Sequence, residues 1–214
     1  MKELVVLVHG FLVQGYHMMY MARELRKLGY ATLVPYLPTG WKNVAACSGK
    51  LDIFLKKHRL QDFMPIHFVG HSMGGLIIRH YLSVQHVANI GRVVLMGTPN
   101  RGSPQSRYVS EHFPPMRRFC EAPLRDLAEP GLEIAPPLND PAPQIGVIIG
   151  MGPRIILSGL LEDIQGPHDG LVPLQSARLP GAEEVLLPHN HTLLNWNPRS
   201  VRLVDRFLRT GKFE

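Results

Sequence analysis

Cysteine is nearly absent from this sequence of 214 residues, which contains only Cys47 and Cys120. Small folds held by disulfides carry several cysteines, and structural metal sites need ligands grouped at short spacing. The two isolated thiols match neither pattern. We therefore expect two free cysteines in a reducing compartment, no metal site and no cofactor.

Long apolar runs are also missing, because no segment approaches the roughly 20 apolar residues that a membrane-spanning helix requires. The apolar stretch Leu4–Val8 is too short for the core of a signal peptide, and no small-residue cleavage site follows it. These absences predict a cytoplasmic protein without a transmembrane segment.

No block of like charge stands out, although the formal net charge is +6. One periodic set of cations lies near the C-terminus at helical spacing, namely Arg199, Arg202, Arg206 and Arg209. We interpret it as the solvated face of a terminal helix and expect no nucleic-acid partner. Association with nucleic acid or a membrane through this face would depend strongly on salt.

Hydrophobic residues make up 45% of the chain and charged residues 19%, an ordinary globular balance that predicts a single domain over 1–214. Short β-rich runs alternate with helical patterns, which indicates an α/β fold with a mostly parallel sheet. About six strands are expected, near 4–8, 31–35, 65–69, 91–96, 144–149 and 183–187.

Two segments interrupt this alternation. Residues 99–143 hold ten of the chain's 19 prolines and show no sustained periodicity, and residues 151–167 are apolar and irregular. Long excursions in a compact domain are either functional loops or plain surface insertions, and the sequence leaves both open. Each segment is a candidate lid.

The pentapeptide Gly70-His71-Ser72-Met73-Gly74 closes one apolar run and opens a helix-like one. A serine between two glycines at a strand-to-helix turn is how a chain exposes a hydroxyl for nucleophilic attack. Because a serine hydroxyl is a poor nucleophile at neutral pH, Ser72 needs a base, and the base needs an orienting acid.

Both partners are available on later loops in the order serine, aspartate, histidine. The loop after the fifth strand contains Asp169 in an Asp-Gly turn, which favours it over Asp163 in a more helix-like stretch. The loop after the sixth strand contains His189 and His191, and either could serve as the base.

Five segments in this order resemble those of α/β-hydrolases, and the chain looks like a small lipase- or esterase-like member. They are Val8-His9-Gly10-Phe11, Gly70 to Gly75, Gly97 to Ser103, His168 to Pro173, and His191-Thr192-Leu193-Leu194. The resemblance implies a minimal α/β-hydrolase fold without a large cap domain.

The resemblance also implies the roles of the site residues. Ser72 would be the nucleophile, Asp169 the acid and His191, rather than His189, the base. The backbone N–H groups of Phe11 and Met73 would form the oxyanion hole.

The sequence therefore predicts a serine hydrolase that cleaves carboxylic esters of small molecules or lipids through an acyl-enzyme intermediate. The same triad could serve a thioesterase, an amidase or an acyltransferase, because it does not encode the leaving group. A catalytically silent binding module is the alternative from another class. The acyl chain length and the oligomeric state are left open.

Overall fold

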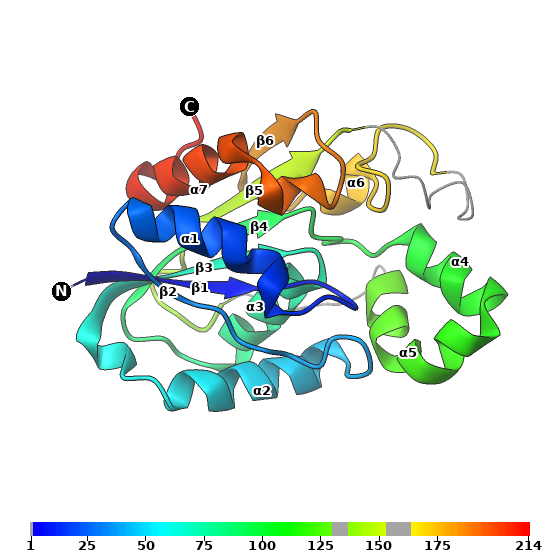
Figure 1. The fold of residues 1–214 in the computed structure, drawn as a ribbon, viewed down its shortest axis with the longest axis horizontal. Helices are drawn as coiled ribbons and strands as arrows, with labels where there is room; N and C mark the ends of the chain where they lie inside the picture. Colours follow the sequence, from blue (N-terminus) through cyan, green and yellow to red (C-terminus); the bar gives the residue numbers. More distant parts are fainter. Residues whose placement is uncertain (1, 130–136, 153–163) are drawn as a thin grey trace.

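The computed structural model describes residues 2–129, 137–152 and 164–214, and its centre is a six-stranded sheet (Figure 1). The strand order is β2-β1-β3-β4-β5-β6, and every neighbouring pair is parallel. The predicted mostly parallel sheet of about six strands is confirmed. The strands are β1 (Lys2–Val8), β2 (Ala31–Leu33), β3 (Phe63–His71), β4 (Ile90–Met96), β5 (Ile145–Gly150) and β6 (Glu183–Leu187).

Alternation along the strands builds a separate core on each face of the sheet. In β1, Val5 and Leu7 pack into one cluster, whereas Leu4, Val6 and Val8 pack into the other. The first cluster is covered by α1 (Met19–Lys27) and α7 (Pro198–Thr210). The second is covered by α2 (Val44–Lys56) and α3 (Met73–Val84), on the opposite side of the sheet in Figure 1.

The last helix has clear boundary signals. The Asn197 side chain accepts a hydrogen bond from the Arg199 N–H (2.7 Å), Pro198 occupies the first turn, and Gly211 ends the helix with φ of 77°. The arginines of the C-terminal set are all exposed, as expected for a solvated helix face. Shorter elements are η1 (Gly15–Met18), η2 (Leu60–Asp62), α6 (Leu174–Ala177) and η4 (Leu193–Trp196).

Our interpretation of 99–143 as an irregular excursion is wrong, because this segment contains two helices, α4 (Pro104–His112) and α5 (Pro114–Ala128). Both helices begin with proline, which is tolerated in the first turn but resembles a breaker in the sequence. In α5, Cys120 has non-helical angles (φ −123°, ψ 22°) three residues before Pro123, so the helix is kinked there. The pair lies beyond the carboxyl ends of the strands (Figure 1).

The second candidate lid, 151–167, falls mainly on residues 153–163, which lie outside the described residues.

Within the described ranges, no helix combines the length and apolar character needed to cross a bilayer. Cys47 and Cys120 are both free and buried, and burial raises the pKa of the Cys47 thiol to about 11.

Close packing of α3 on β1 yields a first prediction. A Cβ added at Gly74 would lie 2.2 Å from the Val8 carbonyl oxygen, a backbone atom that cannot rotate away. We expect Gly74→Ala to lower the free energy of unfolding by about 3 kcal/mol or more, measured by urea denaturation.

The matched control is Gly49→Ala in the interior of α2, where nothing lies within 4 Å of the added Cβ. Removing a helical glycine there should raise stability by about 0.5–1 kcal/mol. Equal stability of the two variants would contradict the close approach of α3 to β1.

Candidate active site

Ser72 occupies the turn between the end of β3 and the start of α3. Its backbone has φ of 55° and ψ of −127°, a conformation that non-glycine residues rarely adopt and that is concentrated at functional sites. The Ser72 N–H donates to the Met96 carbonyl oxygen (2.9 Å), which ties the turn to the end of β4. A Cβ at Gly70 would lie 2.6 Å from the Gly75 nitrogen, so the helix folds back directly over the strand.

The loop after β1 passes immediately beside this turn. A Cβ at Gly10 would come within 2.9 Å of the Ser72 Cβ, and the next residue, Phe11, is half-buried. The Gly10 carbonyl accepts hydrogen bonds from the Thr39 hydroxyl (2.8 Å) and the His9 Nδ1–H (3.1 Å), which fix its orientation. Met73 is the first residue of α3, where a backbone N–H has no acceptor within the helix.

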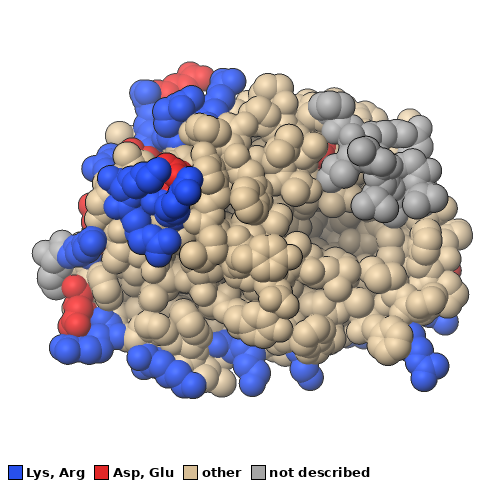
Figure 2. All heavy atoms as spheres, in the orientation of Figure 1, with Lys and Arg blue, Asp and Glu red and all other residues tan. Residues whose placement is uncertain are grey.

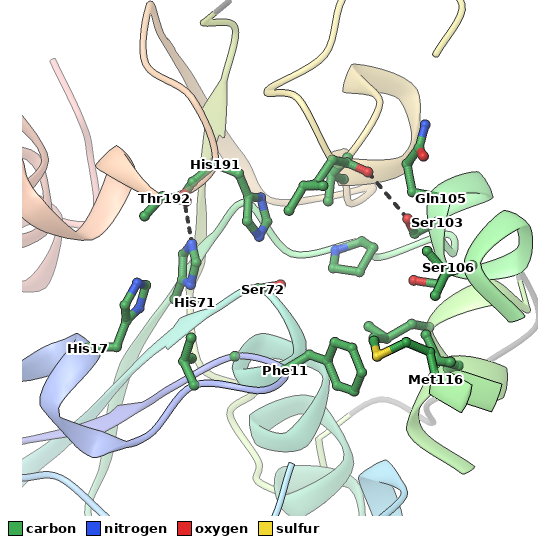
Figure 3. A pocket seen from close by; sticks show the side chains of 18 residues that line it. Phe11, His17, His71, Ser72, Ser103, Gln105, Ser106, Met116, His191 and Thr192 are labelled. Atoms are coloured by element: carbon green, nitrogen blue, oxygen red, sulfur yellow. Dashed lines mark hydrogen bonds between the residues drawn. The ribbon is translucent and has the colours of Figure 1, made fainter. Parts of the chain in front are cut away.

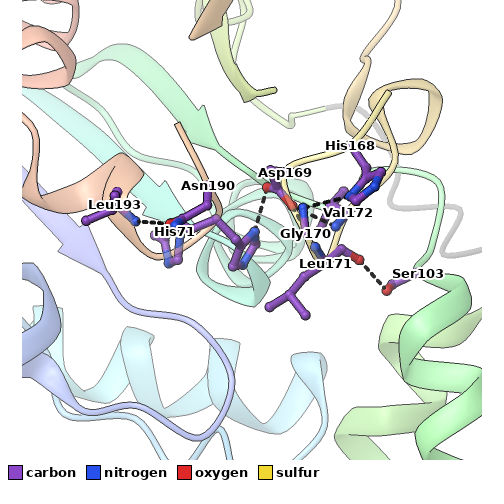
Figure 4. A network of polar contacts seen from close by, with 10 residues as sticks. His71, Ser103, His168, Asp169, Gly170, Leu171, Val172, Asn190 and Leu193 are labelled. Carbon is purple, nitrogen blue, oxygen red and sulfur yellow. Dashed lines mark hydrogen bonds and ion pairs between the residues drawn. The ribbon is translucent and has the colours of Figure 1, made fainter. Parts of the chain in front are cut away.

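Asp169 and His191 form a buried hydrogen-bonded pair between the loops after β5 and β6 (Figure 4). His191 Nδ1 lies 2.7 Å from Asp169 Oδ2, and the two residues are 5% and 1% exposed. The other carboxylate oxygen, Oδ1, accepts from the N–H groups of Leu171 (3.0 Å) and Val172 (2.7 Å). The carboxylate therefore keeps one oxygen for the imidazole.

Glycines make room for this pair. Gly97 follows β4 with φ of 55°, and a Cβ there would lie 3.1 Å from His191 Nδ1 and 3.2 Å from Asp169 Oδ2. A Cβ at Gly150, the last residue of β5, would lie 2.7 Å from the Asp169 Cβ. The segment Gly97 to Ser103 thus contributes space for the pair in addition to shaping its loop.

The alternative candidates differ in their surroundings. His189 Nε2 accepts a hydrogen bond from the Asn197 side-chain amide (2.5 Å), so its partner is Asn197. Asp163 lies outside the described residues.

Among the residues that are described, no group of three His, Cys, Asp or Glu side chains could hold a metal ion.

Ser72 and His191 line one cavity of about 300 Å³ (Figure 3). In this view Phe11 lies below Ser72, and Met116 of α5 lies farther to the right, beyond the Phe11 ring. Its walls are largely apolar and include Val109, Met116, Leu124 and Leu127 from α4 and α5, together with Leu171 and Val172. The wall residues of α4 and α5 could not be recognised in the sequence, because prolines interrupt their helical spacing.

Three further histidines surround the pair. The His71 Nε2–H donates to the His191 carbonyl oxygen (2.9 Å), and the rings of these residues are 4.7 Å apart. Burial above all, and then the neighbouring imidazoles of His191 and His17, hold the pKa of His71 well below its ordinary value. Burial also lowers the pKa of His9 and of His17. These rings are therefore neutral.

No protein-family model and no curated protein sequence matches this chain. Solved structures do. The mature form of lipase BlEst2 from Bacillus licheniformis has a TM-score of 0.78 at 19% identity, covering 97% of this chain and 91% of its own. An esterase from Exiguobacterium antarcticum has a TM-score of 0.69 at 12% identity, covering 98% and 92%.

The chain has the α/β-hydrolase fold. The metagenomic carboxyl esterase MGS0156 matches with a TM-score of 0.71 at 18% identity, covering 89% of this chain and 64% of that one. In an open α/β sheet, ligands bind at the carboxyl ends of the strands where the strand order reverses. In this hydrolase fold that point lies between β1 and β3, which lead to Gly10 and Ser72.

The buried His71 ring gives a prediction about pH. Its folded-state pKa is below the ordinary 6.5, so the unfolded chain takes up this proton first as the pH falls. From this one ring, stability should drop by roughly 1 kcal/mol between about pH 6.5 and pH 5.5. We expect His71→Gln to show a correspondingly smaller drop in urea unfolding.

His86→Gln is the control, because this side chain is exposed to water in the folded chain as it is in the unfolded one. It should retain the wild-type dependence on pH. A wild-type dependence in His71→Gln would show that the ring does not stay neutral in the folded chain.

Proposed function

We propose that this chain hydrolyses carboxylic esters, with Ser72 as the nucleophile, His191 as the base and Asp169 as the acid. The observation that carries the proposal is the buried His191–Asp169 pair, which opens onto the same cavity as a serine on a strained turn. Since the site draws on loops after β1, β3, β5 and β6, residues 1–214 would act as one domain.

In the proposed reaction, Ser72 Oγ attacks the ester carbonyl carbon while His191 Nε2 accepts the hydroxyl proton. Asp169 Oδ2 accepts the Nδ1–H of His191, which fixes the tautomer and stabilises the imidazolium that forms. His191 then donates its proton to the leaving alcohol as the acyl-enzyme forms. Water attacks the acyl-enzyme with His191 again as the base, and the carboxylic acid leaves.

Negative charge on the carbonyl oxygen would be stabilised by the N–H groups of Phe11 and Met73. The Met73 group is at the N-terminus of α3, where the helix dipole also favours an anion. The Gly10 carbonyl and the Phe11 N–H belong to the same planar peptide group. The hydrogen bonds that fix the carbonyl therefore also fix the direction of the N–H. Losing one such donor costs about 10²–10³ in rate.

An ester with an apolar acyl group suits the cavity best. Its wall from α4 and α5 is aliphatic, and the solved structures that match this fold include proteins named esterases and lipases. A water molecule takes about 30 Å³ in the liquid and a methylene group is of similar size, so the cavity holds about ten such groups. That room fits an acyl chain of medium length.

The proposed triad is tested by single substitutions. Ser72→Ala and His191→Ala should each lower kcat for a p-nitrophenyl ester by about 10⁶-fold, and Asp169→Asn by about 10⁴-fold. The wild-type protein should react with a fluorophosphonate probe, and Ser72→Ala should not.

Ser106→Ala and His189→Ala serve as controls. Ser106 lines the same cavity, and His189 is the neighbouring histidine bonded to Asn197. Both variants should keep most of the activity and the labelling. Loss of turnover in His189→Ala with retention in His191→Ala would reverse our assignment of the base, and no labelling of folded wild-type protein would refute the proposed hydrolase.

Acyl preference tests the role of α5. Each buried methylene is worth about 0.8 kcal/mol, so kcat/KM should rise from acetate to about octanoate and then level off or fall. Met116→Trp fills the cavity and should reduce the ratio of octanoate to acetate activity by about tenfold. Met64→Trp, on an exposed methionine of β3, should leave the ratio unchanged, whereas an unchanged ratio in Met116→Trp would place the acyl chain elsewhere.

A further inference from the structure

Two aromatic side chains are strongly exposed beside each other on the outside of the molecule. Trp41 is 58% exposed and Phe119 of α5 is 72% exposed. Together they line a shallow surface pocket whose residues are Trp41, Arg118, Phe119, Glu121, Ala122 and Arg125. None of them has a role in the proposed chemistry.

The other tryptophan of the chain shows that exposure alone is not the unusual feature. Trp196 is 45% exposed, but it stacks on Tyr20 with ring centroids 6.1 Å apart and meets His17 edge-on. Trp41 and Phe119 make no ring contact with any described residue. Phe119 has no polar atom to hydrate, so its exposure leaves apolar area in water that a partner would cover.

Cations accompany the two rings. Arg118 and Arg125 are exposed, and within the described part of the chain neither guanidinium forms a close ion pair or a hydrogen bond, although Arg125 interacts electrostatically with the Asp126 carboxylate. Lys42 follows Trp41 and is also exposed, whereas Glu121 is the one acid that lines the pocket. In Figure 2, Lys and Arg side chains lie along the lower edge, where α2 and α5 lie in Figure 1, and the face around the hollow carries almost no charge.

The aromatic pair adjoins the cavity through two connections. Helix α5 turns Met116, Leu124 and Leu127 toward the cavity, while Arg118 and Arg125 lie on its other side. Leu12 follows cavity-lining Phe11, is 53% exposed with φ of 56°, and its Cδ2 would lie 3.1 Å from a Cβ on Gly40, next to Trp41. An apolar rim therefore runs from the mouth of the cavity to Trp41.

We propose that Trp41, Phe119, Arg118 and Arg125, here called the aromatic–arginine patch, dock the protein onto a membrane surface that contains anionic phospholipids. Tryptophan is favoured at the level of the lipid headgroups, and phenylalanine gains by entering the acyl region. Arginine pairs with lipid phosphate, and basic residues near an anionic leaflet each contribute attraction. The net charge of +6 adds to this attraction.

The surroundings of the patch favour lipid over nucleic acid as the partner. A nucleic acid needs a continuous track of cations along its backbone, whereas the face around the hollow carries almost no charge (Figure 2). An apolar rim bordered by arginines matches the boundary between acyl chains and headgroups. Docking itself is independent of the ester hydrolysis proposed above.

The test is co-sedimentation of the full chain with phosphatidylcholine vesicles that contain or lack phosphatidylglycerol. We expect binding to the anionic vesicles that weakens with salt. Phe119→Ser should weaken it about tenfold or more, and Arg118→Gln about fivefold with a shallower salt dependence. In Trp196→Phe, Trp41 is the sole tryptophan, and its emission should shift to the blue on binding.

The matched controls are an exposed apolar residue and an exposed arginine that lie outside the aromatic–arginine patch. Ile53→Ser removes another exposed apolar side chain, from α2 (50% exposed), and Arg202→Gln removes an exposed arginine from α7. Both should bind like the wild type. Hydrolysis of a short soluble ester should be unchanged in Phe119→Ser, which separates failure of docking from failure of the proposed chemistry.

Three results would overturn the proposal. The first is that the wild-type protein does not bind anionic vesicles. The second is that Phe119→Ser and Arg118→Gln both bind as tightly as the wild type. The third is that Arg202→Gln weakens binding and Arg118→Gln does not. Tighter binding to single-stranded oligothymidine than to anionic vesicles, lost in the same patch variants, would assign the patch to nucleic acid instead.

Discussion

The close contact between the start of α3 and the ends of β1 and β3 is the constraint on which the site depends. Side chains at Gly70 and Gly74 would overlap backbone atoms of Gly75 and of Val8, so the helix can return over the sheet only where Cβ atoms are missing. Ser72 is left at the apex with a positive φ. The strain there is balanced by burial of the first turn of α3, whose residues Met73, Gly74 and Gly75 are all buried.

The remaining site groups are held by backbone contacts between loops rather than by regular structure. The Asp169 carboxylate accepts two N–H bonds from its own loop, and the His191 N–H donates to the Asp169 carbonyl (2.8 Å). The Gly152 N–H donates to the His189 carbonyl (2.9 Å), which joins the loops after β5 and β6. Because the charged atoms are satisfied by fixed dipoles, the pair is buried without an orphaned carboxylate oxygen.

The strands and the site turn could be predicted because their signals are local. Leu4–Val8 reads as a doubly buried strand, the glycines beside Ser72 define a turn, and Asp169 precedes a turn glycine. Helices α4 and α5 could not be predicted, since Pro114 and Pro123 hide a buried face at helical spacing. The exposure of Trp41 and Phe119 could not be predicted from the sequence either, because it depends on packing between segments that are distant in sequence.

Helix α5 connects the two proposals made for this chain. Its Asp126 carboxylate accepts the N–H of Val44 (2.7 Å) at the start of α2, and its Leu127 carbonyl accepts the N–H of Ser103 before α4. The helix dipole of α2 strengthens the first bond, although burial raises the pKa of Asp126. Met116 and Phe119 lie within one turn of this helix, so lipid contact outside and acyl contact inside would act on the same rigid element.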